Sequence, residues 1–238
     1  YCRGQPPGMD PAVLRDDMVD SLEHESKGCV HSEAVSVAMR AVPRHEFVDD
    51  ERGAYADRPF ERLGSRVLAP STAARLFEAL SPEPDDSVLV VGAGVGYTAA
   101  VLAEIVGDRS VQAVDITRRL VYDARTNLAE AGYEGVLVDC RDGASGFPEY
   151  GPYDRILLEA AAVSPPEALL DQLAPDGRLV MPLGAREQAL SVVDRNGDVE
   201  RLGVADREIP LRTQARPAVV ADGELDRRPI TDREAAQL

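Results

Sequence analysis

A short apolar run that leads into three closely spaced glycines constrains the fold of this chain more than any other segment. Val88 to Val91 are all apolar, and Gly92, Gly94 and Gly96 follow at two-residue intervals. A fully apolar run of this length is typical of a strand that is buried on both faces. Glycines let the backbone turn tightly and approach a ligand where a Cβ would collide. The segment therefore predicts a buried strand, a glycine loop and a helix whose first N–H groups are free to bind a ligand.

Strands and helices are expected to alternate after this loop. Amphipathic stretches at 97–106, 119–131 and 166–173 predict helices, and apolar runs predict strands at 111–114, 136–138, 153–158 and 178–182. Such alternation gives right-handed βαβ units and a parallel sheet. Two further apolar runs, 189–193 and 199–204, flank an Asn-Gly pair that is typical of a tight hairpin. We predict an α/β fold with a doubly wound, mostly parallel seven-stranded sheet that ends in an antiparallel hairpin.

The residues before the first strand predict a helical extension. One helix is expected from Pro11 with Asp10 as its cap, a second over 32–41, and a third that opens at Ser71 or Thr72. Residues 43–70 show little periodicity and are expected to form a loop. The predicted organisation is 9–80 for helices and loop packed on the core, 81–211 for the core, and 212–238 for a polar tail. Residues 1–8 do not resemble the start of a fold, and Met9 is a candidate initiator.

Acidic residues follow the next two predicted strands. Asp115 stands 23 residues after Gly92, at a strand end where a carboxylate can accept hydrogen bonds from both ribose hydroxyls. Asp142 and Gly143 follow the third strand, where an aspartate can accept a hydrogen bond from an adenine amino group. Asp115 could instead cap the following helix, and Asp-Gly could be only a turn. Together with the glycine loop, these residues predict an adenosine-type ligand without identifying the cofactor.

Charge and composition narrow the class of partner. The formal net charge is −16, and Lys27 is the only lysine. A dispersed acidic surface almost without lysine resembles that of proteins from extreme halophiles, in which salt screens self-repulsion. An acidic protein of a mesophile with a GC-rich genome is the alternative. Neither offers a basic stripe for phosphates, so a nucleic acid partner is not expected.

Targeting and metal-binding patterns are not evident. No apolar window reaches the ~18 residues of a membrane span, and the first residues lack a signal pattern. Cys2, Cys29 and Cys140 have no CxxC spacing and no histidine pair nearby, so neither a disulfide framework nor a metal site is expected. We expect a cytoplasmic monomer without a membrane partner.

An ordered series of motifs between about Asp16 and Leu211 resembles the protein-L-isoaspartate O-methyltransferase family. Many short matches at the proper spacing are more specific than a glycine loop alone. They are Met39-Arg-Ala-Val-Pro43-Arg-His-Glu-Phe47, Ala54-Tyr55-Ala-Asp57-Arg-Pro59, Ala69-Pro70, Gly151-Pro152-Tyr153-Asp154, Ala160-Ala-Ala162, Leu170-Asp171-Gln172-Leu173, Asp176-Gly177-Arg178-Leu179-Val180-Met-Pro182-Leu-Gly184 and Ile209-Pro210-Leu211.

The resemblance implies the cofactor S-adenosylmethionine and a substrate. Members of the family methylate the α-carboxylate of L-isoaspartyl residues in damaged proteins, and the ester then closes to a succinimide. A carboxylate is already ionised at neutral pH, so the site must align and desolvate the reactants rather than supply a strong base. Cofactor contacts are implied at Gly92, Ala93, Gly94, Gly96, Tyr97, Asp115, Ile116, Asp142 and Gly143.

Three residues depart from the family's pattern. Leu68 stands at the position of the active-site serine and has no hydroxyl, although Ser65, Ser71 or Thr72 could replace it. Val90 stands where an acidic residue helps to position the methionine end of the cofactor. Glu159 stands where a small or hydroxyl residue is usual. It could repel an anionic substrate, act as a base for another acceptor, or face solvent.

The departures predict poor methylation of a standard isoaspartyl peptide. They also leave two alternatives open. One is a methyltransferase for a different carboxylate or peptide, and the other is a cofactor-binding paralogue without repair activity. A nicotinamide oxidoreductase is disfavoured by the motifs outside the glycine loop.

Overall fold

The central strand of the structure is the apolar run that precedes the glycines. The computed structural model describes residues 10–50, 53–160, 162–184 and 188–204, so the expectations for residues 1–8, for Ile209-Pro210-Leu211 and for the 212–238 tail fall outside it. Within the described residues, β3 (Val88–Val91) has parallel neighbours on both sides, β4 (Val111–Asp115) and β6 (Tyr153–Leu158). All four side chains of β3 are buried, as its sequence predicts.

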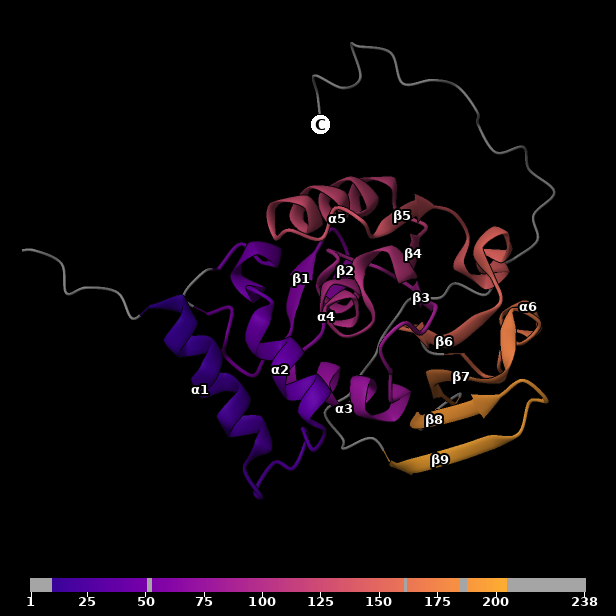
Figure 1. Cartoon of the computed structure of the whole chain (residues 1–238), viewed down its shortest axis with the longest axis horizontal. Helices are drawn as coiled ribbons and strands as arrows, with labels where there is room; N and C mark the ends of the chain where they lie inside the picture. The colour runs from indigo at the N-terminus through magenta and orange to yellow at the C-terminus, as the bar shows by residue number, and fades with distance from the viewer. Residues whose placement is uncertain (1–9, 51–52, 161, 185–187, 205–238) are drawn as a thin grey trace, which may run out of the picture.

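Seven strands form one sheet in the order β5-β4-β3-β6-β7-β8-β9 (Figure 1). The first five strands in this order are parallel to one another, and β8 and β9 form an antiparallel hairpin at the end of the sheet. The predicted seven-stranded, mostly parallel sheet is confirmed. The bounds not yet given are β5 (Leu137–Cys140), β7 (Leu173–Leu183), β8 (Ala189–Asp194) and β9 (Val199–Val204).

Helices cover both faces of the sheet. One buried cluster joins Val88, Val90 and Leu157 to α4 (Tyr97–Val106) and α5 (Arg118–Glu130). The other joins Leu89, Val91 and Ile156 to the short helix α6 (Glu167–Leu170). Alternate residues of β3 therefore enter opposite cores, which is the packing of a doubly wound sheet. No helix in the described part of the chain is long and apolar enough to cross a bilayer.

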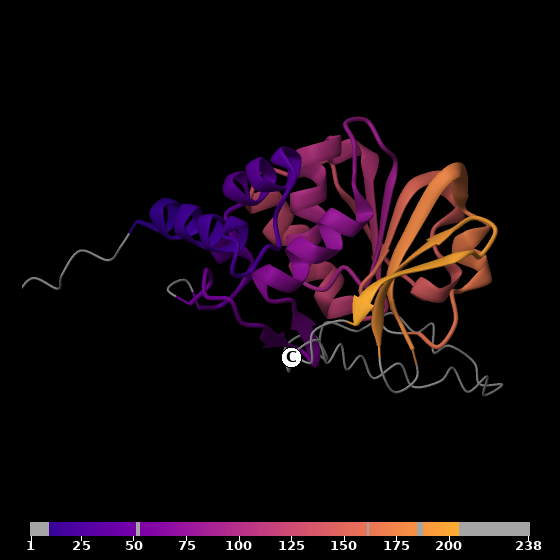
Figure 2. The same cartoon turned by 90° about the horizontal axis from the view of Figure 1, so that it is seen from below.

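The N-terminal helices belong to the first of these cores. They are α1 (Pro11–Glu23), capped by the Asp10 side chain, α2 (Glu33–Ala41), capped by Ser32, and α3 (Pro70–Leu80). The Asp10 cap agrees with the sequence prediction, whereas α3 begins at Pro70 and not at Ser71 or Thr72. Helix α1 and the C-terminal hairpin lie at opposite ends of the molecule (Figure 2), whereas α3 contacts β7 and β8.

Two predictions of local structure are wrong. Residues 43–70 are not all loop, because β1 (Phe60–Arg62) and β2 (Ser65–Val67) form a hairpin and a 3-10 turn, η1, covers Arg44–Phe47. The hairpin turns through Leu63 and Gly64, which both have positive φ, at 50° and 77°. The helix expected over 166–173 is shorter than predicted, because α6 ends at Leu170 and β7 already begins at Leu173. Position 177 of that strand requires glycine, because a Cβ there would lie 2.8 Å from the carbonyl oxygen of Tyr153.

The order of the strands locates a crevice. From β3 the chain crosses to β4 and β5 on one side, and β6 and β7 lie on the other. Where crossovers leave in opposite directions, the carboxyl ends of the two central strands border a crevice in which ligands bind. Here the two ends are Gly92, after β3, and Glu159, after β6.

Candidate cofactor and active site

The glycine loop after β3 has a backbone that side chains would disturb. Gly92, Gly94 and Gly96 have φ values of 93°, 52° and 95°. A Cβ on Gly96 would also lie 3.1 Å from a carbon of Leu128 on α5. The N–H groups of Gly92 and Ala93 both donate to the carbonyl oxygen of Val114, at 2.9 and 3.0 Å. The loop is thus fixed to the neighbouring strand.

Asp115 lies directly beside this loop. Its Oδ2 accepts a hydrogen bond from the Gly94 N–H at 3.0 Å, and its Oδ1 accepts one from the Thr117 N–H at 2.8 Å. Each carboxylate oxygen has a second lone pair for a ligand hydroxyl. The residue is 8% exposed, whereas the next residue, Ile116, is 73% exposed. A carboxylate and an apolar surface therefore adjoin at the end of β4.

Asp142 and Gly143 follow β5, one strand further along. Asp142 caps a short 3-10 turn by accepting a hydrogen bond from the Ala144 N–H at 2.9 Å. A Cβ on Gly143 would lie 2.3 Å from Cγ1 of Val91, so no side chain fits there. Gly143 is thus required for close packing against β3. The two residues lie at the same edge of the sheet as Asp115.

The side chain of Tyr97 points away from the crevice. Its ring meets that of Phe47 edge-on at 5.8 Å, and the Arg44 guanidinium lies 4.5 Å from the ring centroid. Burial raises the pKa of Tyr97 and lowers the pKa of Arg44. Tyr97 can serve a ligand only through its backbone at the start of α4.

Glu159 places a second carboxyl group at the crevice. Its N–H donates to the Val91 carbonyl oxygen at 2.9 Å, and its Oε1 accepts a hydrogen bond from the Thr98 hydroxyl. The residue is partly exposed, but protein atoms surround its carboxyl group, and this burial raises the pKa of Glu159 to about 8. Thr98 opposes the rise and the charge of Asp115 adds to it. These contacts do not fit a glutamate that simply faces solvent.

A family model described as protein-L-isoaspartate(D-aspartate) O-methyltransferase matches residues 15–209. The chain is 45% identical over 188 residues to the protein-L-isoaspartate O-methyltransferase of Aeropyrum pernix, and the aligned residues cover 76% of this chain and 71% of that protein. The chain belongs to this family. A relative from Methanosarcina mazei is 42% identical over 194 residues, or 79% of this chain and 78% of its own.

Solved structures agree on the fold. The structure of a Plasmodium falciparum protein-L-isoaspartate O-methyltransferase in complex with S-adenosyl-L-homocysteine matches with a TM-score of 0.70, covering 80% of this chain and 95% of that one at 22% identity. The chain is thus an S-adenosylmethionine-dependent protein-L-isoaspartate O-methyltransferase, and the predicted family, fold and cofactor are confirmed. The crevice suits that cofactor, because a glycine-rich loop lets a ligand approach the backbone and the carboxyl groups of Asp115 and Glu159 lie beside it.

The side chain at the position of the family serine is buried in the apolar core. Leu68 is 5% exposed and packs in the core of the N-terminal helices, while its carbonyl oxygen accepts a hydrogen bond from Arg44 at 2.7 Å. Ser65, at the start of β2, lies closer to the loop, with its Oγ 3.8 Å from where a Cβ of Gly94 would stand. Ser71 is held by Asp57, which accepts its N–H at 2.9 Å. Of these two serines, Ser65 is therefore the one that lies beside the glycine loop.

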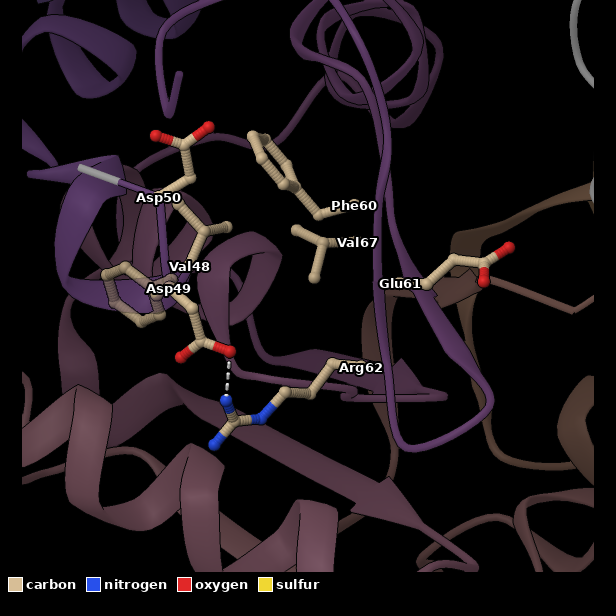
Figure 3. Close-up of a pocket in the computed structure, with 8 residues that line it drawn as sticks. Val48, Asp49, Asp50, Phe60, Glu61, Arg62 and Val67 are labelled. Carbon is tan, nitrogen blue, oxygen red and sulfur yellow. Dashed lines mark hydrogen bonds and ion pairs between the residues drawn. The ribbon is translucent and has the colours of Figure 1, made fainter. Parts of the chain in front are cut away.

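A separate pocket of ≈ 170 Å³ lies between η1 and the β1–β2 hairpin. Phe60 and Val67 point toward Val48 across it, and Arg62 is paired with Asp49 at its lower edge (Figure 3). None of the residues that the sequence predicts for the site lines this pocket. Within the described ranges, no cluster of histidine, cysteine and acidic side chains could hold a metal ion.

The sequence did not identify two residues that shape the site. The Thr98 hydroxyl donates a hydrogen bond to Glu159, and the Arg44 guanidinium donates hydrogen bonds to the carbonyl oxygens of Ala54 and Leu68, at 2.8 and 2.7 Å. Arg44 falls in a matched motif, and that match was the available signal. Thr98 had none, because a threonine in the first turn of a helix is ordinary.

Proposed function

We propose that this enzyme transfers the methyl group of S-adenosylmethionine to the α-carboxylate of L-isoaspartyl residues in damaged peptides and proteins. The observation that carries the proposal is the convergence of the glycine loop, Asp115 and Glu159 at the crevice beside β3. The names of the curated relatives supply the substrate class.

The adenosyl half of the cofactor is assigned to the ends of β3, β4 and β5. Asp115 would accept hydrogen bonds from the ribose hydroxyls with the lone pairs that its two backbone partners leave free. The exposed side chain of Ile116 would pack on the adenine ring, and Asp142 would accept a hydrogen bond from the adenine amino group. The backbone of residues 92–97, including the N–H of Tyr97, would follow the methionyl half.

The protein's part in the reaction is to position and desolvate. S-adenosylmethionine supplies an activated methyl group on a sulfonium. The acceptor carboxylate is ionised at neutral pH, so no side chain has to remove a proton. Ser65, above the glycine loop, would donate a hydrogen bond to the acceptor carboxylate and hold one oxygen in line with the methyl group. The buried Leu68 would support the hairpin region from below without touching the substrate.

A pair of matched peptides tests the proposal. One carries an L-isoaspartyl residue and the other a normal aspartyl residue in the same sequence, and both are incubated with S-adenosylmethionine labelled in its methyl group, at molar potassium chloride. We expect base-labile label in the isoaspartyl peptide alone. Label in both peptides, or in the aspartyl peptide only, would assign the enzyme to a different carboxylate. Asp115→Ala should abolish the label at cofactor concentrations that saturate the wild type.

A further inference from the structure

Glu159 lies beside the glycine loop, at the carboxyl end of β6. The residue follows β6 directly, where Leu158 lies beside Val91 of β3 and the N–H of Glu159 donates to the Val91 carbonyl oxygen. The space for a Cβ on Gly92 is 3.5 Å from the Cβ of Glu159. The carboxyl group therefore borders the glycine loop on the side opposite to Asp115, which follows β4.

Among the described residues, no cation acts on the pKa of this group. Within the described residues, the groups that act on its pKa are Thr98, through a hydrogen bond, and Asp115, through its charge, and neither is positive. Val90 and Leu157, which pair on the neighbouring strand ends, are fully buried and apolar. A carboxyl group in such surroundings favours the neutral acid at pH 7, and a nearby positive charge favours its ionised form.

We propose that Glu159, oriented by Thr98, is the anionic partner of the α-ammonium group at the methionyl end of the bound cofactor. This inference rests on the proposed function, because it presupposes that the cofactor lies along the glycine loop. The partial exposure of Glu159 gives a ligand in the crevice access to it. Thr98 is a positioning residue, because it acts on the cofactor only through the carboxyl group that it holds.

The cofactor has a second positive group, the sulfonium, but a carboxylate suits it poorly. The charge on sulfur disappears as the methyl group leaves, so an anion beside it would stabilise the donor more than the transition state. The α-ammonium keeps its charge throughout the reaction. A carboxylate that holds the ammonium strengthens binding in both states and leaves the barrier unchanged.

Proton release gives a test that needs no turnover. Burial raises the pKa of Glu159 to about 8 in the free protein, so the group is mostly neutral at pH 7. An ammonium partner lowers that pKa, and binding must then expel the proton. Calorimetric titration of S-adenosylhomocysteine into wild-type enzyme at pH 7, in phosphate and in Tris, should show release approaching one proton. The affinity should rise between pH 6.0 and 7.5.

Three ligands and two variants separate the possible contacts. S-adenosylhomocysteine keeps the ammonium without the sulfonium, and 5′-methylthioadenosine has neither. Glu159→Gln should weaken S-adenosylhomocysteine and S-adenosylmethionine alike, by roughly ten- to a hundredfold, and should leave 5′-methylthioadenosine unchanged. It should also abolish proton release. Thr98→Val should shift the pH profile of affinity upward, because its hydroxyl lowers the pKa of Glu159. Glu130→Gln, an exposed glutamate at the end of α5, controls for the lost charge.

Each other outcome contradicts a defined claim. Equal affinity of Glu159→Gln and wild type for S-adenosylhomocysteine would overturn the inference, and so would unaltered proton release in the variant. Loss of S-adenosylmethionine affinity alone would place the carboxylate at the sulfonium. Loss of 5′-methylthioadenosine affinity as well would make Glu159 a structural residue. If the wild type bound neither S-adenosylhomocysteine nor S-adenosylmethionine, the proposed function itself would fail.

Discussion

Leu68 and Ser65 lie three residues apart, but they occupy different surroundings. Leu68 is a buried member of the core, and Ser65 adjoins the glycine loop. The sequence alone identified a missing hydroxyl at Leu68 and could not choose among three serine and threonine candidates. The choice depends on the path of the β1–β2 hairpin, which the sequence did not predict.

The two positions should respond differently to truncation. Ser65→Ala should lower kcat for the isoaspartyl peptide by roughly ten- to a hundredfold, the scale for a hydrogen bond to a charged group, with little change in melting temperature. Leu68→Ala should instead lower the free energy of unfolding by about 2–5 kcal/mol, as for other buried leucines. Peptide kinetics and urea unfolding measure the two effects, with Ser21→Ala on the exposed face of α1 as control. A normal kcat in Ser65→Ala would remove this serine from the site.

At the level of elements, the seven-stranded sheet with its β8–β9 hairpin could be predicted from the sequence, and the β1–β2 hairpin could not. Each strand of the core carries an apolar run, so the runs alone located β3, β4 and β6 to within a residue. The strands β1 and β2 have three residues each and too few side chains to show an alternation. Their turn uses Leu63 at positive φ, where leucine is rare, so no turn signal marked it. The loop-like Pro-Asp-Gly in β7 hid the true start of that strand.

Ion pairs hold the hairpin on α5. Arg62 of β1 pairs at 3.0 Å with Asp123, whose side chain is 9% exposed, and Arg119 pairs with the same carboxylate at 3.3 Å from a position 57% exposed. A surface pair contributes ~1 kcal/mol or less, and breaking a buried one costs ~3–5 kcal/mol. The Arg62–Asp123 coupling energy, from a double-mutant cycle of alanine variants in urea, should fall between these values. The Arg119–Asp123 cycle serves as control and should give less than ~1 kcal/mol. Equal couplings would show that Arg62 does not anchor the hairpin.

For the whole molecule, the net charge of −16 is the dominant property. Like charges spread over a folded surface repel one another, and salt screens them over ~10 Å at 0.1 M and ~3 Å at 1 M. The melting temperature should therefore rise as potassium chloride increases from about 0.1 M to a few molar. Differential scanning fluorimetry measures this directly. A flat or falling melting temperature would reject the expectation of a protein adapted to high salt.

The roles of Asp115, Ile116 and Glu159 all depend on where the cofactor lies, and a crystal structure with S-adenosylhomocysteine tests this directly. The ribose hydroxyls should lie within hydrogen-bond distance of Asp115, the adenine beside Ile116 and Asp142, and the α-ammonium against Glu159. Density for the ligand outside the crevice between β3, β4 and β6, or ribose hydroxyls that do not reach Asp115, would contradict the account.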